Sequence, residues 1–298
     1  MVLKINTPTN NLSNFVGNTP LIKITDKIWV KAELMNPSGS IKDRMAINII
    51  NDAEKSGKIK IGDTIIEATS GNAGISFAWL AAERGYKIKI VMPSNMSQER
   101  KNILKFYGAE LIEVGPGDFE GAINLRNKLS KENGWFNTNQ FSNHLNIEAH
   151  FNSTAQEILN QVEDDEISAL ISGTGTGGTI MGCHKRLIQK FKNMRTIAVE
   201  PEESPVMSGG QPGLHGIQGI GDGSKFLVDL SVVDKIYTVK TEEAKSKALQ
   251  LTKELGLFVG ISAGANVVAS EKFVNDFKPK GRVITFLCDR GDRYLSCF

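Results

Sequence analysis

The chain has 298 residues, of which 40% are hydrophobic and 23% are charged, and its formal net charge is +2. A charge balance this close to neutral argues against a nucleic-acid-binding surface, and the length suits one large or two medium domains. No apolar run approaches the roughly 18 residues that a membrane-spanning helix needs, so no membrane partner is expected.

The first half of the chain alternates short apolar runs, typical of strands, with amphipathic stretches, typical of helices. The predicted strands are 28–30, 64–67, 87–92 and 110–114. The predicted helices are 43–55, 73–84, 97–107 and 119–132. Strands and helices that alternate in this way form a parallel sheet covered by helices.

The second half repeats this alternation around one long interruption. The predicted helices are 145–161, 178–190, 242–255 and 262–273, and the predicted strands are 169–172, 196–200, 232–239 and 283–288. Residues 201–230 are rich in Gly, Pro and Ser and show no period, which indicates a long surface segment with a function. We expect two α/β units that meet near residues 140–150, with a ligand in the cleft between them.

Cysteine usage and the N-terminal sequence indicate the cytoplasm. The three cysteines, Cys183, Cys288 and Cys297, are odd in number and have no CxxC spacing, which is typical of reduced thiols. The N-terminal stretch has no apolar core and does not predict a signal peptide. The four histidines are scattered without ligand spacing, so no metal site is expected.

Segment 37–44, PSGSIKDR, places Lys42 at the start of a predicted helix. A helix N-terminus attracts anions and repels cations, so it favours the neutral form of a nearby amine. A neutral amine is what a lysine needs to form a Schiff base. The alternative is a surface lysine beside a helix cap formed by Ser40.

Segment 67–74, EATSGNAG, follows a predicted strand and opens a predicted helix. Turn chemistry by itself explains Gly71 and part of the preference for Asn72. The hydroxyls of Thr69 and Ser70 are crowded together with the N–H groups of the helix start. Such a cluster of donors predicts a nest for a carboxylate.

Segment 172–179, SGTGTGGT, is a glycine-rich loop between a strand and a helix, where N–H groups can approach a phosphate. It lacks the GK[ST] ending of a nucleotide P-loop. Gly173, Gly175 and Gly178 fit the GxGxxG pattern, and Glu200 ends the next strand where a ribose-binding acid would lie. A dinucleotide site is therefore an alternative on this motif alone. A single phosphate agrees better with the lysine and carboxylate motifs upstream.

Taken together, seven motifs resemble the cysteine synthases, or O-acetylserine sulfhydrylases, which are pyridoxal-phosphate (PLP) enzymes of fold type II. In chain order the motifs are PSGSIKDR, TSGNAG, NQF (139–141), GTGGT (175–179), GIQGIGDG (216–223), GISAGA (260–265) and CDRGDRYLS (288–296). The resemblance extends from NTPL (18–21) to Ser296 and covers nearly the whole chain.

The resemblance implies a fold of two three-layer α/β domains, similar to the β-subunit of tryptophan synthase, with the active site in the cleft between them. The smaller, mobile domain would be 38–146, and the larger domain would be 1–37 plus 147–298. The smaller domain would carry the Schiff-base lysine and the substrate-carboxylate loop. That loop is expected to close when an anion binds, and the larger domain would carry the phosphate loop.

The resemblance also implies roles for individual residues. Lys42 would hold PLP as a Schiff base and then act as the base that takes the Cα proton. Asn72 would bond the ring 3′-oxygen, and Ser262 would face the pyridine nitrogen. The phosphate would lie among Gly175, Thr176, Gly177, Gly178 and Thr179. The substrate carboxylate would lie among Thr69, Ser70, Gly71, Ala73 and Gln140.

Three positions near the substrate entrance depart from the family pattern. Ala73 replaces a common threonine, His144 replaces a proline-bearing sequence, and Asp222 replaces a small apolar residue. Asp222 is therefore a second candidate catalytic residue, which could orient an incoming amine or water or take a proton from the nucleophile. The alternative is a turn residue that faces water.

The activity that the resemblance implies is β-replacement: O-acetyl-L-serine and sulfide would give L-cysteine and acetate. One alternative is a sister enzyme that uses O-phosphoserine, for which Lys225 is a candidate cation, although Asp222 would repel such a donor. Another sister enzyme would use L-cysteine, releasing sulfide and forming lanthionine or serine. A non-catalytic binding protein is a third possibility, which Lys42 and the intact phosphate loop disfavour. The resemblance further implies a homodimer and a serine acetyltransferase partner.

Overall fold

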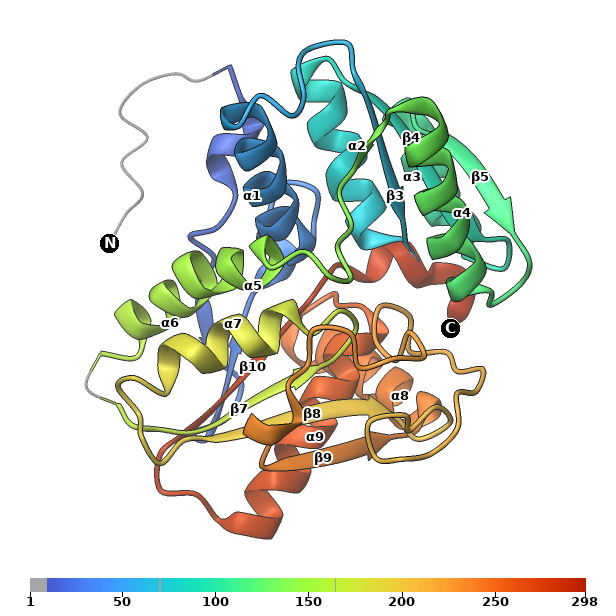
Figure 1. Ribbon diagram of the computed structural model, residues 1–298. Coiled ribbons are helices and arrows are strands. Elements are labelled where there is room, and N and C mark those ends of the chain that lie inside the picture. The colour runs from blue at the N-terminus through green and yellow to red at the C-terminus, as the bar shows by residue number, and fades with distance from the viewer. Residues whose placement is uncertain (1–9, 70, 164) are drawn as a thin grey trace.

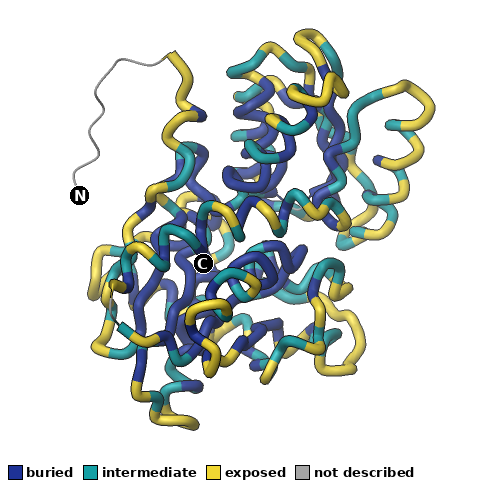
Figure 2. The backbone as a smooth tube through the Cα atoms, turned by 60° about the vertical axis from the view of Figure 1, so that its left-hand side comes forward, coloured by how far each residue is buried: buried dark blue, intermediate teal, exposed yellow. Residues whose placement is uncertain are grey.

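The computed structural model describes residues 10–69, 71–163 and 165–298. The chain forms two mainly parallel sheets, one of six strands and one of four, and each sheet is covered by helices (Figure 1). This arrangement confirms the α/β fold predicted from the alternating pattern. Buried residues are concentrated along the two sheets and the helices packed on them, whereas exposed residues lie on the outer connections (Figure 2).

The six-stranded sheet is built from both ends of the chain. Its strands, in spatial order, are β1 (Leu21–Lys23), β2 (Ile28–Lys31), β10 (Arg282–Phe286), β7 (Ile167–Gly173), β8 (Arg195–Pro201) and β9 (Lys235–Val239). Strand β1 pairs antiparallel with β2, and the other neighbouring pairs are parallel. Because these strands are parallel, their carboxyl ends lie together at one edge of the sheet. Ligands of α/β proteins bind at that edge.

Helices cover both faces of the six-stranded sheet, because successive strand residues point to opposite sides. Ala169 and Ile171 pack in one core with helices α8 (Thr241–Leu255) and α9 (Ile261–Phe277). Leu170, between them, packs in a separate core with helices α6 (Ala155–Gln161) and α7 (Gly178–Leu187). The result is the three-layer arrangement expected for this part of the chain.

The four-stranded sheet has the order β5 (Glu110–Val114), β4 (Lys87–Pro93), β3 (Thr64–Ala68) and β6 (Phe136–Asn137), and all its pairs are parallel. Ile65 and Ile90 face helices α1 (Lys42–Lys55), α2 (Asn72–Arg84) and α3 (Gln98–Phe106). Ile66 and Val91 face the opposite side, where helix α4 (Phe119–Asn133) packs. This sheet is also enclosed between two layers of helices.

Several element boundaries differ from the sequence prediction. The helix predicted at 145–161 is interrupted: α5 (Leu145–Ala149) and α6 flank a π-helical turn, His150–Thr154. Strands β1 and β6 were not predicted, because three and two residues are too few to show a period. The strand predicted at 232–239 begins at Lys235, after a 3-10 turn at Leu230–Val232.

The remaining 3-10 helices are Leu12–Phe15, Glu33–Met35 and Gly291–Cys297. Residues 202–229 hold no helix or strand, as the predicted long segment requires. Across the described ranges, no helix is long and apolar enough to cross a membrane. The three cysteines are free thiols.

Candidate active site

Two adjacent cavities between the sheets bring together most of the residues singled out from the sequence. The first is lined by Lys42, Asn72, Gly175, Thr176, Gly177, Thr179 and Ser262, among others. The second is lined by Lys42, Thr69, Asn72, Ala73, Gln140 and Asp222, among others. Gly71 and Gly178 are not among the described residues that line either cavity, and Ser70 lies outside the described residues. Motifs far apart in the sequence thus share one site.

Lys42 is the first residue of α1 and lines both cavities. Its backbone N–H donates to Ser40 Oγ at 3.3 Å, and Ser40 is fully buried. The alternative expected Lys42 on the surface with Ser40 as the helix cap, but the N-cap of α1 is Ile41 and Lys42 is half-buried. The amine instead stands at a helix N-terminus inside the site.

The residue after Lys42 ties the start of α1 to α2. The Asp43 carboxylate accepts hydrogen bonds from the Ser38 N–H at 2.7 Å and from the Ser76 hydroxyl at 2.6 Å. Burial raises the pKa of the Asp43 carboxyl, and these hydrogen bonds act in the opposite direction. The sequence pattern gave no role to this residue, whose contacts fix the position of the neighbouring lysine.

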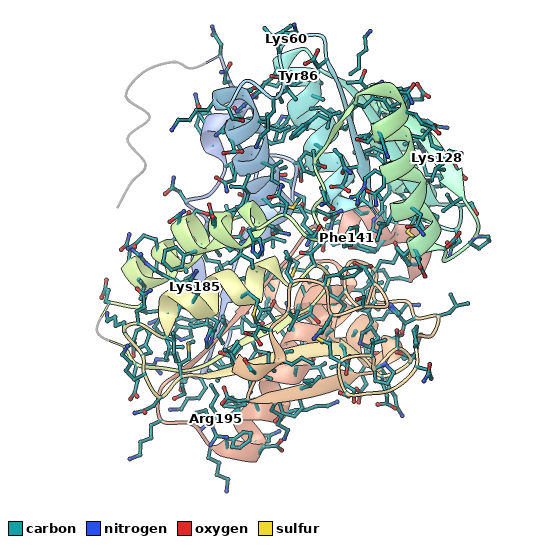
Figure 3. All side chains as sticks on the ribbon, viewed as in Figure 1. Lys60, Tyr86, Lys128, Phe141, Lys185 and Arg195 are labelled. Atoms are coloured by element: carbon teal, nitrogen blue, oxygen red, sulfur yellow. The ribbon has the colours of Figure 1, made fainter. Side chains whose placement is uncertain are left out.

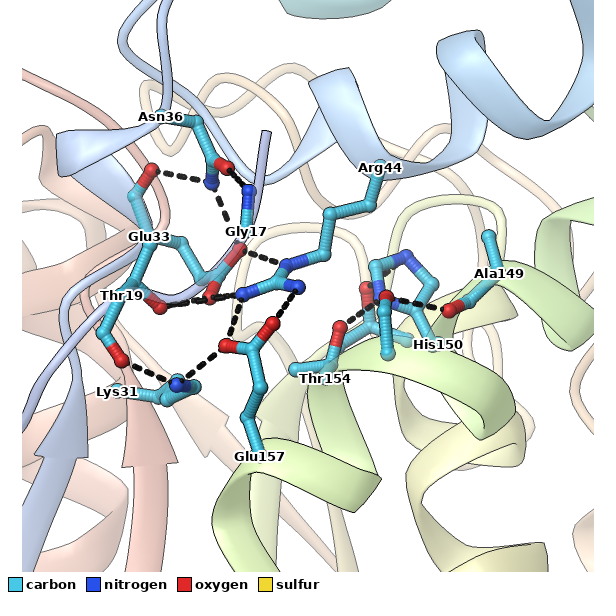
Figure 4. Close-up of polar contacts among 12 residues, drawn as sticks. Gly17, Thr19, Lys31, Glu33, Asn36, Arg44, Ala149, His150, Thr154 and Glu157 are labelled. Atoms are coloured by element: carbon cyan, nitrogen blue, oxygen red, sulfur yellow. Dashed lines mark hydrogen bonds and ion pairs between the residues drawn. The ribbon is translucent and has the colours of Figure 1, made fainter. Parts of the chain in front are cut away.

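Arg44 ties the same turn to the six-stranded sheet through a buried ionic cluster (Figure 4). Its guanidinium donates to Glu33 at 2.6 Å and to Glu157 at 2.7 Å. Lys31, from strand β2, also contacts Glu157 at 2.7 Å. Burial raises the pKa of Glu157, but the hydrogen bonds from Arg44 outweigh it and hold the pKa at about 2. The two residues after Lys42 therefore hold the start of α1 in place: Asp43 binds to α2, and Arg44 binds to the half that contains the six-stranded sheet.

The glycine-rich loop joins strand β7 to helix α7 and forms one wall of the first cavity. Gly177 is the N-cap of α7 with φ +87°, and a Cβ atom there would lie 2.6 Å from Val228 Cγ2. Only glycine fits this position without strain. At Gly178, a Cβ atom would lie 2.0 Å from Asn146 Oδ1. The absence of a side chain at Gly178 thus lets Asn146, in α5, approach the loop closely.

The groups that line the first cavity fit a phosphate and an aldehyde. Thr176 and Thr179 contribute hydroxyls, Lys42 contributes an amine, and none of the described residues that line this cavity is Asp or Glu. The N–H groups at the start of α7 add a favourable potential for an anion. The donor set therefore suits pyridoxal phosphate.

The dinucleotide alternative is not supported at Glu200. Its carboxylate is buried and accepts hydrogen bonds from the N–H groups of Met207 at 2.7 Å and Ser208 at 3.0 Å. Glu200 lines neither cavity. Its carboxylate organises the start of the long irregular segment and is not available to a ribose.

The Asn72 amide lines both cavities and is held from behind by the C-terminal motif. Its nitrogen donates to Asp289 at 2.6 Å, and its oxygen accepts from Arg293. Since an amide nitrogen carries two protons, one remains to donate into the cavity. Cys288, from the same motif, lines the first cavity, and burial raises the pKa of its thiol to about 12. The motif was noticed in the sequence, but these contacts were not.

The carboxylate side of the site is built on Gly71 and Gln140. The Gly71 N–H donates to Thr69 Oγ1 at 3.0 Å, and the Gln140 amide donates to the Ala68 carbonyl at 3.0 Å. A Cβ atom at Gly71 would lie 2.6 Å from Arg100 Cδ, so the Arg100 side chain packs directly against this loop. Arg100 comes from α3 and was not identified from the sequence.

Asp222 separates the second cavity from a wider entrance cavity of about 730 Å³ and lines both. Burial raises the pKa of its carboxyl, while the charges of Lys42, His215 and Arg100 act in the opposite direction. Asp222 is half-buried and is shared by both cavities. Lys225 is exposed and is not among the residues that line the entrance.

Aromatic packing joins the entrance to the floor of the site. The rings of Phe141 and Phe226 have centroids 4.5 Å apart. Phe141 is labelled in Figure 3, where it lies between the two halves of the molecule. Phe141 lines the second cavity and Phe226 lines the entrance. The irregular segment 202–229 thus reaches the site, as its length suggested.

The chain matches the family described as pyridoxal-phosphate dependent enzyme over residues 12–289. It is 42% identical to a cysteine synthase of Staphylococcus aureus, across 97% of this chain and 96% of that protein. The solved cysteine synthase of Entamoeba histolytica has a TM-score of 0.91 at 38% identity, covering 99% of this chain and 92% of that one. A hydrogen sulfide-producing enzyme of Fusobacterium nucleatum has a TM-score of 0.91 at 38% identity, covering 97% of this chain and 100% of that one.

Proposed function

Because this chain belongs to the cysteine synthase family of pyridoxal-phosphate dependent enzymes, we propose that it converts O-acetyl-L-serine and sulfide to L-cysteine and acetate. It is an enzyme, and pyridoxal phosphate is its cofactor. The observation that carries the substrate proposal is the pair of adjacent cavities that share Lys42, Asn72 and Thr176. An amino-acid substrate and the cofactor can therefore meet at one lysine.

When bound, pyridoxal phosphate withdraws electrons from the Cα of the amino acid joined to it, so that the Cα proton becomes acidic and the β-substituent can leave. The Lys42 amine would hold the cofactor aldehyde and, once free, would take the Cα proton. Asn72 and Ser262 would bond polar atoms of the ring. Gly175, Thr176, Gly177, Gly178 and Thr179 would hold the phosphate.

Substrate orientation would come from the loop at the start of α2. Its N–H groups and the hydroxyl of Thr69 would bind the substrate carboxylate, together with the Gln140 amide. The full set proposed around the carboxylate is Thr69, Ser70, Gly71, Ala73 and Gln140. Ala73 lines the second cavity without the hydroxyl that a threonine would offer to the carboxylate.

A second candidate function is supported by Asp222: release of sulfide from L-cysteine, with addition of water or a second cysteine. Its carboxyl group lines both the entrance and the cavity that contains Lys42. From there it would take a proton from an incoming water or thiol as that nucleophile adds to Cβ. The O-phosphoserine alternative is disfavoured, since no lysine or arginine is found among the described residues that line the entrance.

One substrate screen tests these alternatives. Purified protein with its cofactor is mixed with O-acetyl-L-serine plus sulfide, with L-cysteine alone, and with O-phospho-L-serine plus sulfide. We expect cysteine and acetate from the first mixture. Sulfide release from cysteine at a higher kcat/KM would instead identify the second function. Turnover of phosphoserine alone, or of none of the three, would overturn both.

A domain movement is also proposed from the family. The smaller domain, 38–146, would close on 1–37 plus 147–298 when the substrate carboxylate binds. Crystal structures with and without O-acetyl-L-serine would test this, and identical domain positions would contradict it. Arg44 joins α1 to the larger sheet, so the boundary of the moving part is the detail to compare.

The family also supports a homodimer, a serine acetyltransferase partner and a cytoplasmic location. Light scattering of the purified protein measures the first, and a mixture with serine acetyltransferase measures the second. A strictly monomeric protein, or one that never co-elutes with the acetyltransferase, would contradict the respective proposal. Fractionation of cells that express the protein measures its location.

A further inference from the structure

A helix outside the cavities holds the first hydroxyl of the phosphate loop. Asn146, in α5, donates from its amide nitrogen to Thr176 Oγ1 at 2.9 Å, and the Gly178 N–H lies 3.4 Å from the same oxygen. Both groups can only donate, so the hydroxyl oxygen accepts and its own proton must point elsewhere. Thr176 lines both cavities, which is where that proton can be used.

His150 holds the second hydroxyl of the loop. It lies in the π-helical turn, is only 1% exposed, and has its Nε2 atom 3.2 Å from Thr179 Oγ1. Its other ring nitrogen, Nδ1, lies 2.9 Å from Thr154 Oγ1, and Figure 4 shows these two residues side by side. The imidazole thus spans the distance between one threonine of the π-helical turn and one of the phosphate loop.

The contact between the two helices explains how His150 reaches the loop. A Cβ atom at Gly182 would lie 2.4 Å from the Ile147 carbonyl oxygen and 2.7 Å from His150 Cβ. Only glycine lets α7 come this close, and Thr179 lies one turn earlier on the same face of α7. The π-helical turn begins at His150, the residue whose imidazole contacts Thr179, and such turns are often found at functional sites.

The proton of His150 decides which way Thr179 points. Burial, together with the charges of Arg44 and Lys42, lowers the pKa of His150 well below its usual value, so the ring is neutral and carries one N–H. If Nε2 carries the proton, Thr179 accepts it and its own hydroxyl proton is free for the cavity. If Nδ1 carries the proton, Thr179 must donate to His150 and has no proton to offer a ligand.

We propose that Asn146 and His150 are positioning residues that orient the hydroxyls of Thr176 and Thr179 as donors to the cofactor phosphate. A phosphate group presents oxygen acceptors. The backbone fixes the direction of the N–H donors in this loop, but each threonine hydroxyl can rotate, so a neighbouring residue must orient it. His150 then exists as the neutral tautomer with the proton on Nε2, and Thr154 donates to Nδ1. This inference rests on the proposed function, because the phosphate is that of the cofactor.

The first test compares the binding of pyridoxal phosphate with that of pyridoxal, which lacks the phosphate. His150→Phe keeps the ring volume without the hydrogen bonds, and His150→Gln can restore a donor near the Nε2 position. We expect His150→Phe to weaken pyridoxal phosphate binding by about three- to tenfold and pyridoxal binding by about twofold at most, because the Thr179 hydroxyl loses the neutral hydrogen bond that orients it toward the phosphate. His150→Gln should recover most of the difference.

A matched control is available in α7, the helix that contains Thr179. His184, in α7, makes a similar imidazole–threonine contact, with its Nδ1 atom 2.6 Å from Thr196 Oγ1, but lines neither cavity. His184→Phe should leave the ratio of the two affinities unchanged. Equal losses for pyridoxal phosphate and pyridoxal in His150→Phe would overturn the positioning role.

The second test needs no variant and so does not depend on folding of a mutant. Nitrogen-15 NMR of the wild-type protein with bound pyridoxal phosphate should show Nε2 of His150 protonated and Nδ1 unprotonated. A proton on Nδ1 would overturn the assignment. If the wild-type protein binds neither pyridoxal compound, the proposed function fails. The tautomer measured with inorganic phosphate at the loop would then decide the role of His150 separately.

Discussion

Glu157→Gln is the substitution that best tests the ionic cluster beneath Lys42. The change keeps the shape of the side chain and removes its charge, which faces Arg44 at 2.7 Å and Lys31 at 2.7 Å. Both cations are fully buried, so each loses a compensating charge that water cannot replace. We expect a clear loss of folding stability at neutral pH.

The size of this loss follows from the pKa of Glu157, which folding lowers from 4.5 to about 2. At about 1.4 kcal/mol for each pKa unit, the charged form is favoured by about 3 kcal/mol in the folded protein. The side chain is 16% exposed, so solvent screening reduces this to about 2 kcal/mol. For a chain of this size, that loss lowers Tm by about 3 °C.

The sign of the pH dependence is fixed by the direction of this pKa change. A carboxyl group whose pKa is lowered by folding contributes its full stability above its unfolded pKa and loses it as the pH falls toward the folded value. The glutamine variant lacks this contribution at every pH. The difference in unfolding free energy between wild type and variant should therefore be largest above pH about 5 and shrink below pH about 4.

Urea unfolding followed by circular dichroism, at pH about 7, about 5 and about 3.5, measures this difference. The control is Glu132→Gln, because Glu132 is 54% exposed and lies 4.0 Å from Lys128. That variant should change stability by less than about 0.5 kcal/mol. A Glu157→Gln protein as stable as wild type at neutral pH would refute the reasoning. So would a loss that does not vary with pH.

Three further predictions concern the site and its packing. Lys42→Ala should fold normally, lose the visible absorbance of the bound cofactor and lose turnover; retention of a substantial fraction of wild-type turnover would contradict its role. Asp222→Asn should leave the release of acetate from O-acetyl-L-serine nearly unchanged and slow the addition of water or thiol in stopped-flow experiments; equal rates for every nucleophile would leave Asp222 a turn residue. Gly182→Val should destabilise the protein by about 2 kcal/mol, because its Cβ would lie 2.4 Å from a backbone carbonyl. Gly115→Val is the control, since its nearest contact is at 3.8 Å, and equal Tm values for the two variants would contradict this account.

Much of the fold could be predicted from the sequence because its signals are local. Period-two and period-3.6 patterns located the longer helices and strands, and glycines after strands located the loops that face a ligand. The same local signals missed β1 and β6, which are only three and two residues long. They also could not show that the helix predicted at 145–161 contains a π-helical turn, because one extra residue in a turn leaves the hydrophobic pattern nearly intact.

The sequence by itself determined the site as a set of motifs, because each motif is a loop whose glycines and hydroxyls have a local conformational reason. Only the tertiary structure decided which charges meet. Arg44 lies 113 positions from Glu157 in the chain, and Asn72 lies 217 positions from Asp289. Strand β2 pairs with β10 from the other end of the chain, and this pairing helps to bring the C-terminal motif to the site. Buried ion pairs and oriented hydroxyls depend on ångström distances between such distant segments, which no local pattern encodes.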